Sequence, residues 1–296
     1  MATFIRFWFY PLLLLATLAF ALLALYADAS LPIAFSTFAA LRLALLLGVE
    51  LCWPYRKTWA ISWRSFIRDL KYAVLVGGTG FALKFGATWL AISAADERRG
   101  ALAQWPLILQ LIIVALTYEF FQYWQHRCSH EARGPLGRFL WRTHLQHHLP
   151  RRVYLLMHVV GHPLNFALIF ILKFSVLYAL GASGAAIYLF GVLLGLQGLV
   201  SHFNVQISAG PLNYLLVGTE LHRHHHSANL AEAGNYGVLT PFWDIVFGTF
   251  RYDANKAPEA LGVSAPEHYP TSNQIVATMA LPFYPAVPYS RKNDEP

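Results

Sequence analysis

The stretch His222-Arg-His-His-His226 decides how this chain folds, because it repeats a histidine spacing that occurs twice earlier. The earlier blocks are His126-Arg-Cys-Ser-His130 and His144-Leu-Gln-His-His148, and 12 of the 13 histidines lie between His126 and His226. Residues three or four apart lie on one face of a helix, so each block can direct two or three imidazoles to one point. Eight such ligands are too many for one metal ion and suit two. The fold must therefore bring three separate blocks together.

Metal binding is indicated by the repetition rather than by any single histidine. A lone histidine is more often a surface or hydrogen-bonded residue, but three blocks with ligand spacing in one stretch favour a metal centre. The blocks are internal and interrupted, which argues against an affinity tag. Imidazole suits zinc, copper, iron and nickel, so the ligand type leaves the metal open. The two cysteines, Cys52 and Cys128, form neither a disulfide framework nor a CxxC motif.

The composition is that of a membrane protein. The 296 residues are 56% hydrophobic and 12% charged, with a mean hydropathy of +0.43, whereas soluble domains carry about 25% charged residues. The net charge of +7 could indicate nucleic-acid binding. However, the basic residues flank apolar runs, as they do beside membrane helices. We therefore expect no nucleic-acid partner.

The apolar runs predict an all-α integral membrane protein with a bundle of about four to six membrane helices, since a bilayer core of about 30 Å takes about 20 residues. We expect the first run to be a membrane helix rather than a cleavable signal peptide, because it is longer than a signal core. The last two runs could form a full or a re-entrant hairpin. The predicted helices cover residues 8–27, 33–53, 73–94, 102–130, 165–180 and 182–201.

Residues 54–72 predict an amphipathic helix on the membrane surface. Two stripes run along it, one apolar and one basic: Trp59, Trp63, Phe66 and Leu70, and Arg64, Arg68 and Lys71. The positive-inside rule places this basic segment in the cytoplasm. Alternating the predicted helices from there puts both termini and all three histidine blocks on the cytoplasmic face.

Longer stretches around the blocks carry a family resemblance. They are Glu119-Phe-Phe-Gln-Tyr-Trp-Gln-His-Arg-Cys-Ser-His130, Leu140-Trp-Arg-Thr-His-Leu-Gln-His-His148 and Glu220-Leu-His-Arg-His-His-His-Ser227. Asn235-Tyr-Gly237 and Trp243-Asp-Ile-Val-Phe-Gly-Thr249 follow the third. Over residues 110–252 the chain resembles the fatty acid hydroxylase/sterol desaturase superfamily of membrane diiron oxygenases.

The resemblance implies two iron ions and a set of histidine ligands. The ligands of the three blocks are His126, His130, His144, His147, His148, His222, His225 and His226. His202 matches a further family histidine and would be the ninth ligand, and His162 matches a recurrent position, as a ligand or as a partner of one. His158 lies four residues before His162, and we expect it on the same helical face. His158, His224 and His268 are expected outside the ligand set.

Other polar residues are expected to support the ligands. Glu119 stands where relatives usually have Asp. It could accept a hydrogen bond from a ligand imidazole, or pair with a nearby arginine. Asn235 and Asp244 are expected to hold the structure around the ligands.

The chain departs from the family pattern after the second block. Leu149, Tyr154 and Val160 stand where the family often has Ser, Asn and Arg. The metal set is untouched, but the altered segment does not support a sterol-specific function.

The predicted organisation has three parts. Residues 1–109 form N-terminal membrane helices and the surface helix, residues 110–252 form the diiron domain, and residues 253–296 form a C-terminal tail that ends in a disordered segment over 289–296.

The resemblance implies a lipid hydroxylase that uses O₂ and two electrons to convert C–H into C–OH. The substrate would be a fatty acyl chain, an acyl-bearing polar lipid or a sterol-like ring. The sequence contains no dinucleotide fingerprint, so the electrons would come from an external reductase with a cytochrome or ferredoxin.

Two alternatives stay open at this point. Desaturation by the same dimetal centre is the closest. A metal transporter or sensor is an alternative from another class, although a transporter should place polar ligands within its spans. The Ala/Leu/Arg-rich composition favours a bacterial inner membrane over endoplasmic reticulum. The attacked carbon and the oligomeric state are left open.

Overall fold

The computed structural model describes residues 1–74, 100–254 and 256–284, with isolated positions 78, 83, 85, 86 and 89. These residues form helices and loops, and within them the only β-type pairing is an isolated bridge between Ser227 and Leu261. The predicted all-α class is therefore confirmed. Most of the predicted span over 73–94 and all of the terminal segment over 289–296 lie outside the described residues.

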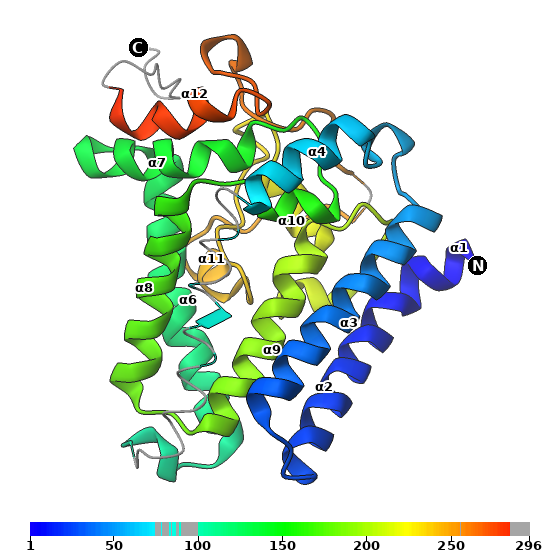
Figure 1. Cartoon of the computed structure of the whole chain (residues 1–296), viewed down its shortest axis with the longest axis vertical. Coiled ribbons are helices and arrows are strands. Elements are labelled where there is room, and N and C mark those ends of the chain that lie inside the picture. The colour runs from blue at the N-terminus through cyan, green and yellow to red at the C-terminus, as the bar shows by residue number, and fades with distance from the viewer. Residues whose placement is uncertain are drawn as a thin grey trace.

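Five helices are long and apolar enough to cross a membrane, and Figure 1 shows them running alongside one another. The first combines α1 (Ala2–Phe4), a π-helical stretch (Ile5–Phe9) and α2 (Tyr10–Tyr26). The others are α3 (Leu31–Cys52), α6 (Leu107–Glu131), α8 (Pro163–Leu180) and α9 (Gly184–Ser201). Both helices of the last pair have sufficient length to cross, as a full hairpin requires. The prediction of a helical membrane bundle is confirmed.

Helix α9 lies at the centre of this bundle. Of its apolar window, 72% is buried, against 22–33% for the other four candidate spans. The Tyr10 hydroxyl donates to Gln197 Oε1 at 3.0 Å, which links α2 to α9. Arg42 on α3 is 3% exposed and donates to the carbonyl oxygen of Val192 at 2.5 Å. The arginine inside a predicted span thus faces protein, as a charge within a membrane must.

Helix α6 starts later than predicted. A 3₁₀ turn (Leu102–Gln104) precedes it, and the α-helix begins at Leu107 after Pro106. A proline disfavours helical conformation in the residue before it and itself fits the first positions of a helix. The predicted start at residue 102 is therefore wrong by five residues, while the predicted end at His130 is within one residue of Glu131.

The basic segment is also divided. A 3₁₀ turn (Lys57–Trp59) is followed by α4 (Trp63–Tyr72), which begins where Ser62 and Ser65 form a reciprocal capping box. Trp59 is buried outside α4, so it does not share the helix face of Trp63 as predicted. Arg68 is likewise buried, because it forms an ion pair with Asp69 at 2.6 Å. Only part of each predicted stripe therefore lies on one exposed helix.

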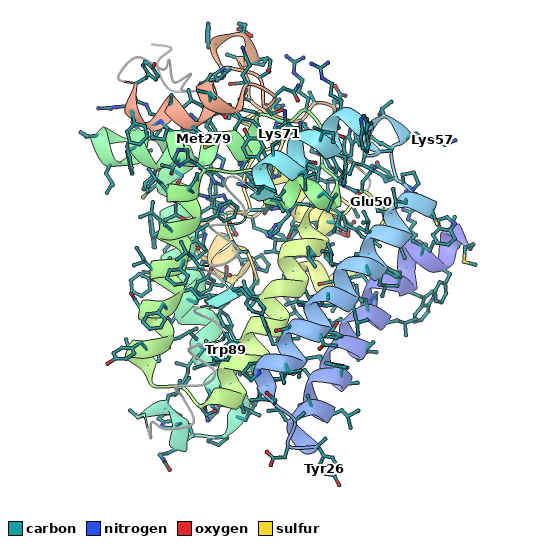
Figure 2. All side chains as sticks on the ribbon, in the orientation of Figure 1. Tyr26, Glu50, Lys57, Lys71, Trp89 and Met279 are labelled. Atoms are coloured by element: carbon teal, nitrogen blue, oxygen red, sulfur yellow. The ribbon has the colours of Figure 1, made fainter. Side chains whose placement is uncertain are left out.

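The remaining short helices gather mainly at one end of the bundle, opposite the α2–α3 and α8–α9 turns (Figure 1). Figure 2 places Lys57, Lys71 and Met279 at this end and Tyr26 at the other. We call it the histidine end. Its elements are α7 (Gly134–His148), α10 (Thr219–His225), α11 (Phe242–Val246) and α12 (Ile275–Ala280), with 3₁₀ turns at Leu155–Val159, Gly210–Tyr214, Pro266–His268 and Leu281–Phe283.

The C-terminal segment over residues 272–283 packs against the histidine end. Gln146 Nε2 donates to the carbonyl oxygen of Thr278 at 2.6 Å, and the Tyr72 and Thr278 hydroxyls are 2.9 Å apart. Leu281 is buried against Leu145 and Trp141. Residues 272–283 therefore connect α4 to α7.

Glu50 joins three segments, and its removal tests how much this junction stabilises the fold. Its carboxylate accepts backbone N–H bonds from Leu155 at 2.9 Å and from Asn204 at 2.7 Å. We expect Glu50→Ala to lower the unfolding temperature in detergent markedly, because each orphaned buried N–H costs about 1–3 kcal/mol. Leu51→Ala, at a neighbouring exposed position, should change it little. Equal effects of the two variants would contradict the assignment.

Candidate metal centre

Nine histidines form two groups at the histidine end. Group one is His126, His130, His144, His148 and His225, and group two is His147, His202, His222 and His226. Within each group, one ring nitrogen of every member lies within 4.8 Å of the others. These are the nine histidines predicted as ligands from the sequence. The structure brings them together, and their binding of metal stays a prediction.

Helix periodicity explains how the groups are divided. On α7, His144 and His148 are four residues apart and face group one, whereas His147 faces group two. The same H-x-x-H-H pattern at the end of α10 works in reverse: His222 and His226 face group two and His225 faces group one. Each pattern thus contributes to both groups, which keeps the two groups adjacent.

The distances between ring nitrogens fit metal ligation. His144 Nε2 lies 3.0 Å from both His126 Nε2 and His148 Nε2, in group one. In group two, His202 Nε2 lies 3.0 Å from both His147 Nε2 and His222 Nε2. Two nitrogens at right angles around one ion, each about 2.1 Å from it, lie about 3.0 Å apart. The donor set therefore fits two transition-metal ions.

Hydrogen bonds on the far side of the rings leave lone pairs facing one another in group two. His147 Nδ1 donates to the carbonyl oxygen of Val160 at 3.1 Å, and His202 Nδ1 donates to that of Gly198 at 3.2 Å. A neutral imidazole carries one proton, so both Nε2 atoms present lone pairs to each other at 3.0 Å. Facing lone pairs repel unless a proton or a metal ion lies between them.

Burial disfavours the proton. It lowers the pKa of His147 to about 4, and it lowers those of His202 and His222 well below their ordinary value, with neighbouring histidines adding to the effect. These rings are therefore neutral near pH 7, which is the state that binds metal. His225 Nε2 is also buried and has no hydrogen-bond partner among the described residues. A metal ion satisfies all these nitrogens.

Carbonyl groups of one loop orient the ligands of group one. His126 Nδ1 donates to Tyr236 O at 2.8 Å, and His225 Nδ1 donates to Gly234 O at 2.9 Å. Asp244 holds the loop, because its carboxylate accepts from the backbone N–H of Tyr236 at 2.7 Å and of Gly237 at 2.8 Å. Such outer hydrogen bonds fix the tautomer of a ligating histidine.

Glu119 supports the same loop but bonds no ligand directly. Its carboxylate oxygens accept from the backbone N–H of Val238 at 3.0 Å and of Leu239 at 2.7 Å. The first of these N–H groups belongs to Val238, two residues after Tyr236, whose carbonyl oxygen orients His126. Among the described residues, Glu119 forms neither the predicted bond to an imidazole nor the alternative pair with an arginine.

Asn235 adopts the left-handed conformation with φ of 54°, which asparagine tolerates better than most residues. Its amide donates to the carbonyl oxygens of Leu221 at 2.9 Å and Arg251 at 2.7 Å, and its oxygen accepts from Arg251 N at 2.8 Å. It therefore holds α10, beside His222, to the segment after α11.

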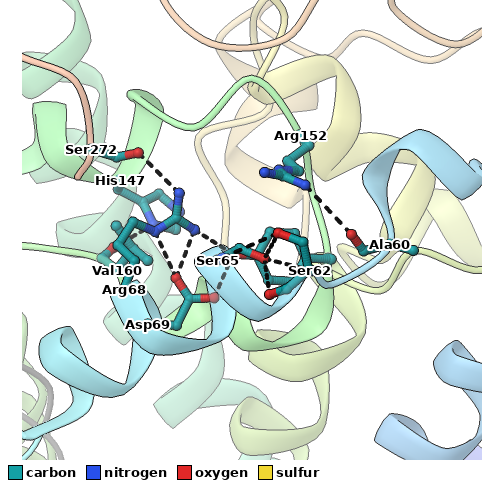
Figure 3. A network of polar contacts seen from close by, with 10 residues as sticks. Ala60, Ser62, Ser65, Arg68, Asp69, His147, Arg152, Val160 and Ser272 are labelled. Carbon is teal, nitrogen blue, oxygen red and sulfur yellow. Dashed lines mark hydrogen bonds and ion pairs between the residues drawn. The ribbon is translucent and has the colours of Figure 1, made fainter.

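A buried polar network supports group two from outside (Figure 3). Arg68 and Asp69 on α4 both bond the Tyr154 hydroxyl, and Arg68 also donates to Ser272 Oγ at 3.0 Å. Tyr154 begins the segment that ends at Val160, whose carbonyl oxygen orients His147. Sequence reasoning had placed Tyr154 and Val160 only as departures from the family pattern.

The other four histidines lie outside both groups. His162 caps α8, since its Nδ1 accepts from Leu164 N at 3.1 Å, and its Nε2 donates to Met279 O at 3.1 Å. His158 belongs to a 3₁₀ turn that ends before His162, so the two do not share a helix face as predicted. His224 donates to Lys256 O at 3.1 Å, and His268 is exposed.

A cavity of about 110 Å³ lies beside the groups and is lined by α6, α8 and α9. Next to the histidines its wall combines the polar residues Gln122, Gln125, Asn165 and Ser201 with the apolar Val160 and Phe166. One helical turn or more further along each helix the lining becomes Tyr118, Ile169 and Leu194. The cavity therefore offers a polar end at the candidate metal centre and a largely apolar end within the bundle.

Comparisons with known proteins agree with this geometry. Residues 111–249 match the family model described as fatty acid hydroxylase, which confirms the resemblance predicted from the motifs. The chain is 29% identical over 250 residues to the ornithine lipid hydroxylase OlsE of Rhizobium tropici. That match covers 81% of this chain and 72% of the relative.

Two rice proteins also match. They are the very-long-chain aldehyde decarbonylases GL1-11 of Oryza sativa subsp. indica and subsp. japonica, each 26% identical over 155 residues. The match covers 50% of this chain and 55% of each relative, so it spans about half of those proteins. No solved structure matches this chain significantly.

His225 and His224 form a matched pair for testing the ligand set. Both are buried neighbours on α10, but only His225 belongs to a group. We expect His225→Ala to lose most of its metal on purification, because a buried site with a missing ligand binds weakly, and His224→Ala to retain it. The metal content per chain of the two variants is measured by atomic emission spectrometry. Equal metal contents of the two variants would exclude His225 as a ligand.

Proposed function

Residues 111–249 belong to the fatty acid hydroxylase family and the chain is an oxidoreductase acting on lipids; from this premise we propose that it hydroxylates a C–H bond of a membrane lipid. The balanced reaction takes one lipid C–H bond, O₂, two electrons and two protons to one C–OH and water. Two iron ions held by the histidine groups would supply the reduction of O₂. The external reductase system predicted from the sequence would supply the electrons.

The facing nitrogens of His147 and His202 carry this proposal, because their fixed tautomers call for a cation at that position. Nine neutral nitrogen ligands and no carboxylate in either group suit a redox metal such as iron better than magnesium or calcium. The chain's part is to hold these rings in place, to exclude bulk water by burying them, and to admit the substrate through the adjacent cavity.

We further propose an acyl-bearing polar lipid, such as an aminolipid, as the substrate. The relative that covers most of the chain is named for ornithine lipid hydroxylation, and the cavity combines a polar end with an apolar end. A lipid that extends its polar part toward the histidines and its hydrocarbon part into the bundle would match both ends. The basic segment over residues 54–72, which includes α4, supports a cytoplasmic position for the centre, in our proposal at a bacterial inner membrane.

Two other functions are weaker. Desaturation would use the same centre, with removal of a second hydrogen in place of oxygen transfer. Metal transport is disfavoured because both groups lie at one end of the candidate spans and not along them.

Comparative lipidomics tests the proposal in a strain that lacks the gene. We expect restoration of the gene to produce a lipid about 16 mass units heavier than its precursor, the mass of one inserted oxygen. Restoration with His225→Ala should fail and with His224→Ala should succeed. A lipid about 2 units lighter would instead make the protein a desaturase. An unchanged lipid profile with altered cellular metal would support the transporter.

A further inference from the structure

Asn165 stands between the histidine groups and the cavity. It is the third residue of α8, is 5% exposed and lines the cavity. One end of its carboxamide lies 3.5 Å from His144 Nδ1, and the Oδ1 atom at the other end is buried with no hydrogen-bond partner among the described residues. A buried amide oxygen without a partner costs free energy, so this end calls for a ligand or for a different orientation of the group.

The tautomer of His144 decides the orientation. If the Asn165 amide donated to His144 Nδ1, the proton of the imidazole would be on Nε2. That atom lies 3.0 Å from the nitrogens of His126 and His148, in the centre of group one. Ligation through Nε2 requires the proton on Nδ1 instead. Rotating the carboxamide by 180° exchanges its oxygen and nitrogen, so that the oxygen accepts from His144 Nδ1–H.

In this orientation the amide N–H₂ group takes the position of the atom that has no partner, in a residue that lines the cavity. Among the described residues no other carbonyl group bonds His144 Nδ1, whereas His126, His147, His202 and His225 each donate to a backbone carbonyl oxygen. Asn165 thus does for His144 what backbone carbonyl groups do for those four ligands. In doing so it gains a free donor at the polar end of the cavity.

We propose that Asn165 positions both the metal centre and the substrate. Its oxygen fixes the His144 tautomer, and its amide donates a hydrogen bond to a carbonyl or hydroxyl oxygen of the lipid, close to the carbon that is hydroxylated. This inference rests on the proposed function and makes it more specific. The substrate carries a hydrogen-bond acceptor near the attacked carbon, so the reaction takes place near the polar end of the lipid and not far along a hydrocarbon chain.

The lining of the cavity supports this choice of substrate. On α6 the residues Gln125 and Gln122 lie nearest the histidines and Tyr118 lies further along; on α8 Asn165 is followed one turn later by Ile169. Gln122 bonds Tyr118 and Gln125, and Gln125 bonds Ser129, so these two amides have partners within α6. The Asn165 amide has an unpartnered atom, and a bare hydrocarbon beside it would leave that atom unpaired at a cost in free energy. A lipid carbonyl or hydroxyl group would satisfy it.

Two substitutions separate the two roles of Asn165. Asn165→Asp keeps an acceptor for His144 Nδ1–H but, as a carboxylate, has no donor for the substrate. Asn165→Leu has a similar size and removes both. Gln110→Leu is the control, because it removes another buried amide, at the far end of α6, where Gln110 bonds Trp105 O and Ser183 N. The variants are purified as full-length, iron-loaded protein in lipid nanodiscs.

The first readout is the rate of iron release to a chelator, which requires no knowledge of the substrate. We expect Asn165→Leu to release iron about 10–100 times faster, as loss of an outer partner of a ligating histidine does, and both Asn165→Asp and Gln110→Leu to match the parent protein. Iron release from Asn165→Leu at the rate of the parent protein would overturn the proposal that Asn165 positions His144. Equal unfolding temperatures of the variants would show that a difference in iron release does not come from a loss of fold.

The second readout is the separation of KM and kcat with the lipid found by lipidomics. We expect Asn165→Asp to raise KM about fivefold, the loss of one hydrogen bond, with kcat reduced less, and Gln110→Leu to leave KM unchanged. An unchanged KM for Asn165→Asp would overturn the contact with substrate. If the iron-loaded parent protein oxidises no lipid, the proposed function fails instead, and the iron-release result still decides the first role.

Discussion

Facing neutral imidazoles impose the main constraint on this structure. The Nε2 atoms of His147 and His202 lie 3.0 Å apart, and their lone pairs repel each other. His147 and His202 cannot turn their lone pairs away, because backbone carbonyl groups hold their opposite nitrogens. Hydrophobic burial alone would not assemble nine such rings, since buried polar atoms without partners are costly. The histidine end is therefore stable only with cations bound, or with strong support from the surrounding polypeptide. It has such support on several sides.

That support is arranged in layers, and carboxylates form the outer one. Asp244 and Glu119 bind backbone N–H groups of the 236–239 loop, and the loop offers a carbonyl oxygen to His126. Glu50 binds the N–H of Leu155 and so holds the segment that leads to Val160. These carboxyl groups bond the backbone of the loops and not the imidazoles, so they fix the loops without forming an ion pair that would hold a proton on a ring. The ligands remain neutral and available to metal.

The sequence predicted which nine histidines come together, because helix periodicity within the three blocks is local and the family resemblance adds His202. Residues 144, 147 and 148 must diverge by known angles on any helix, and no tertiary information is needed. Glu119 was a different problem, because its partners are about 120 residues away in a loop that only the fold brings beside α6. His162 precedes a proline, which favours an extended backbone over a helical one. It therefore caps α8 and does not share a helix face with His158.

Helix α4 shows why sequence periodicity alone does not tell which face of an amphipathic helix is buried against protein. Periodicity finds two stripes but does not tell which stripe meets protein, and here the buried face contains Ser65, Arg68 and Asp69 while Trp63 is 76% exposed. A helix that buries its polar side and exposes its apolar side is favourable beside lipid and unfavourable in water. The same helix bonds Tyr154, at the start of the segment whose last carbonyl group orients His147. Helix α4 and the segment from Tyr154 to Val160 thus connect the exposed Trp63 to the ring of His147.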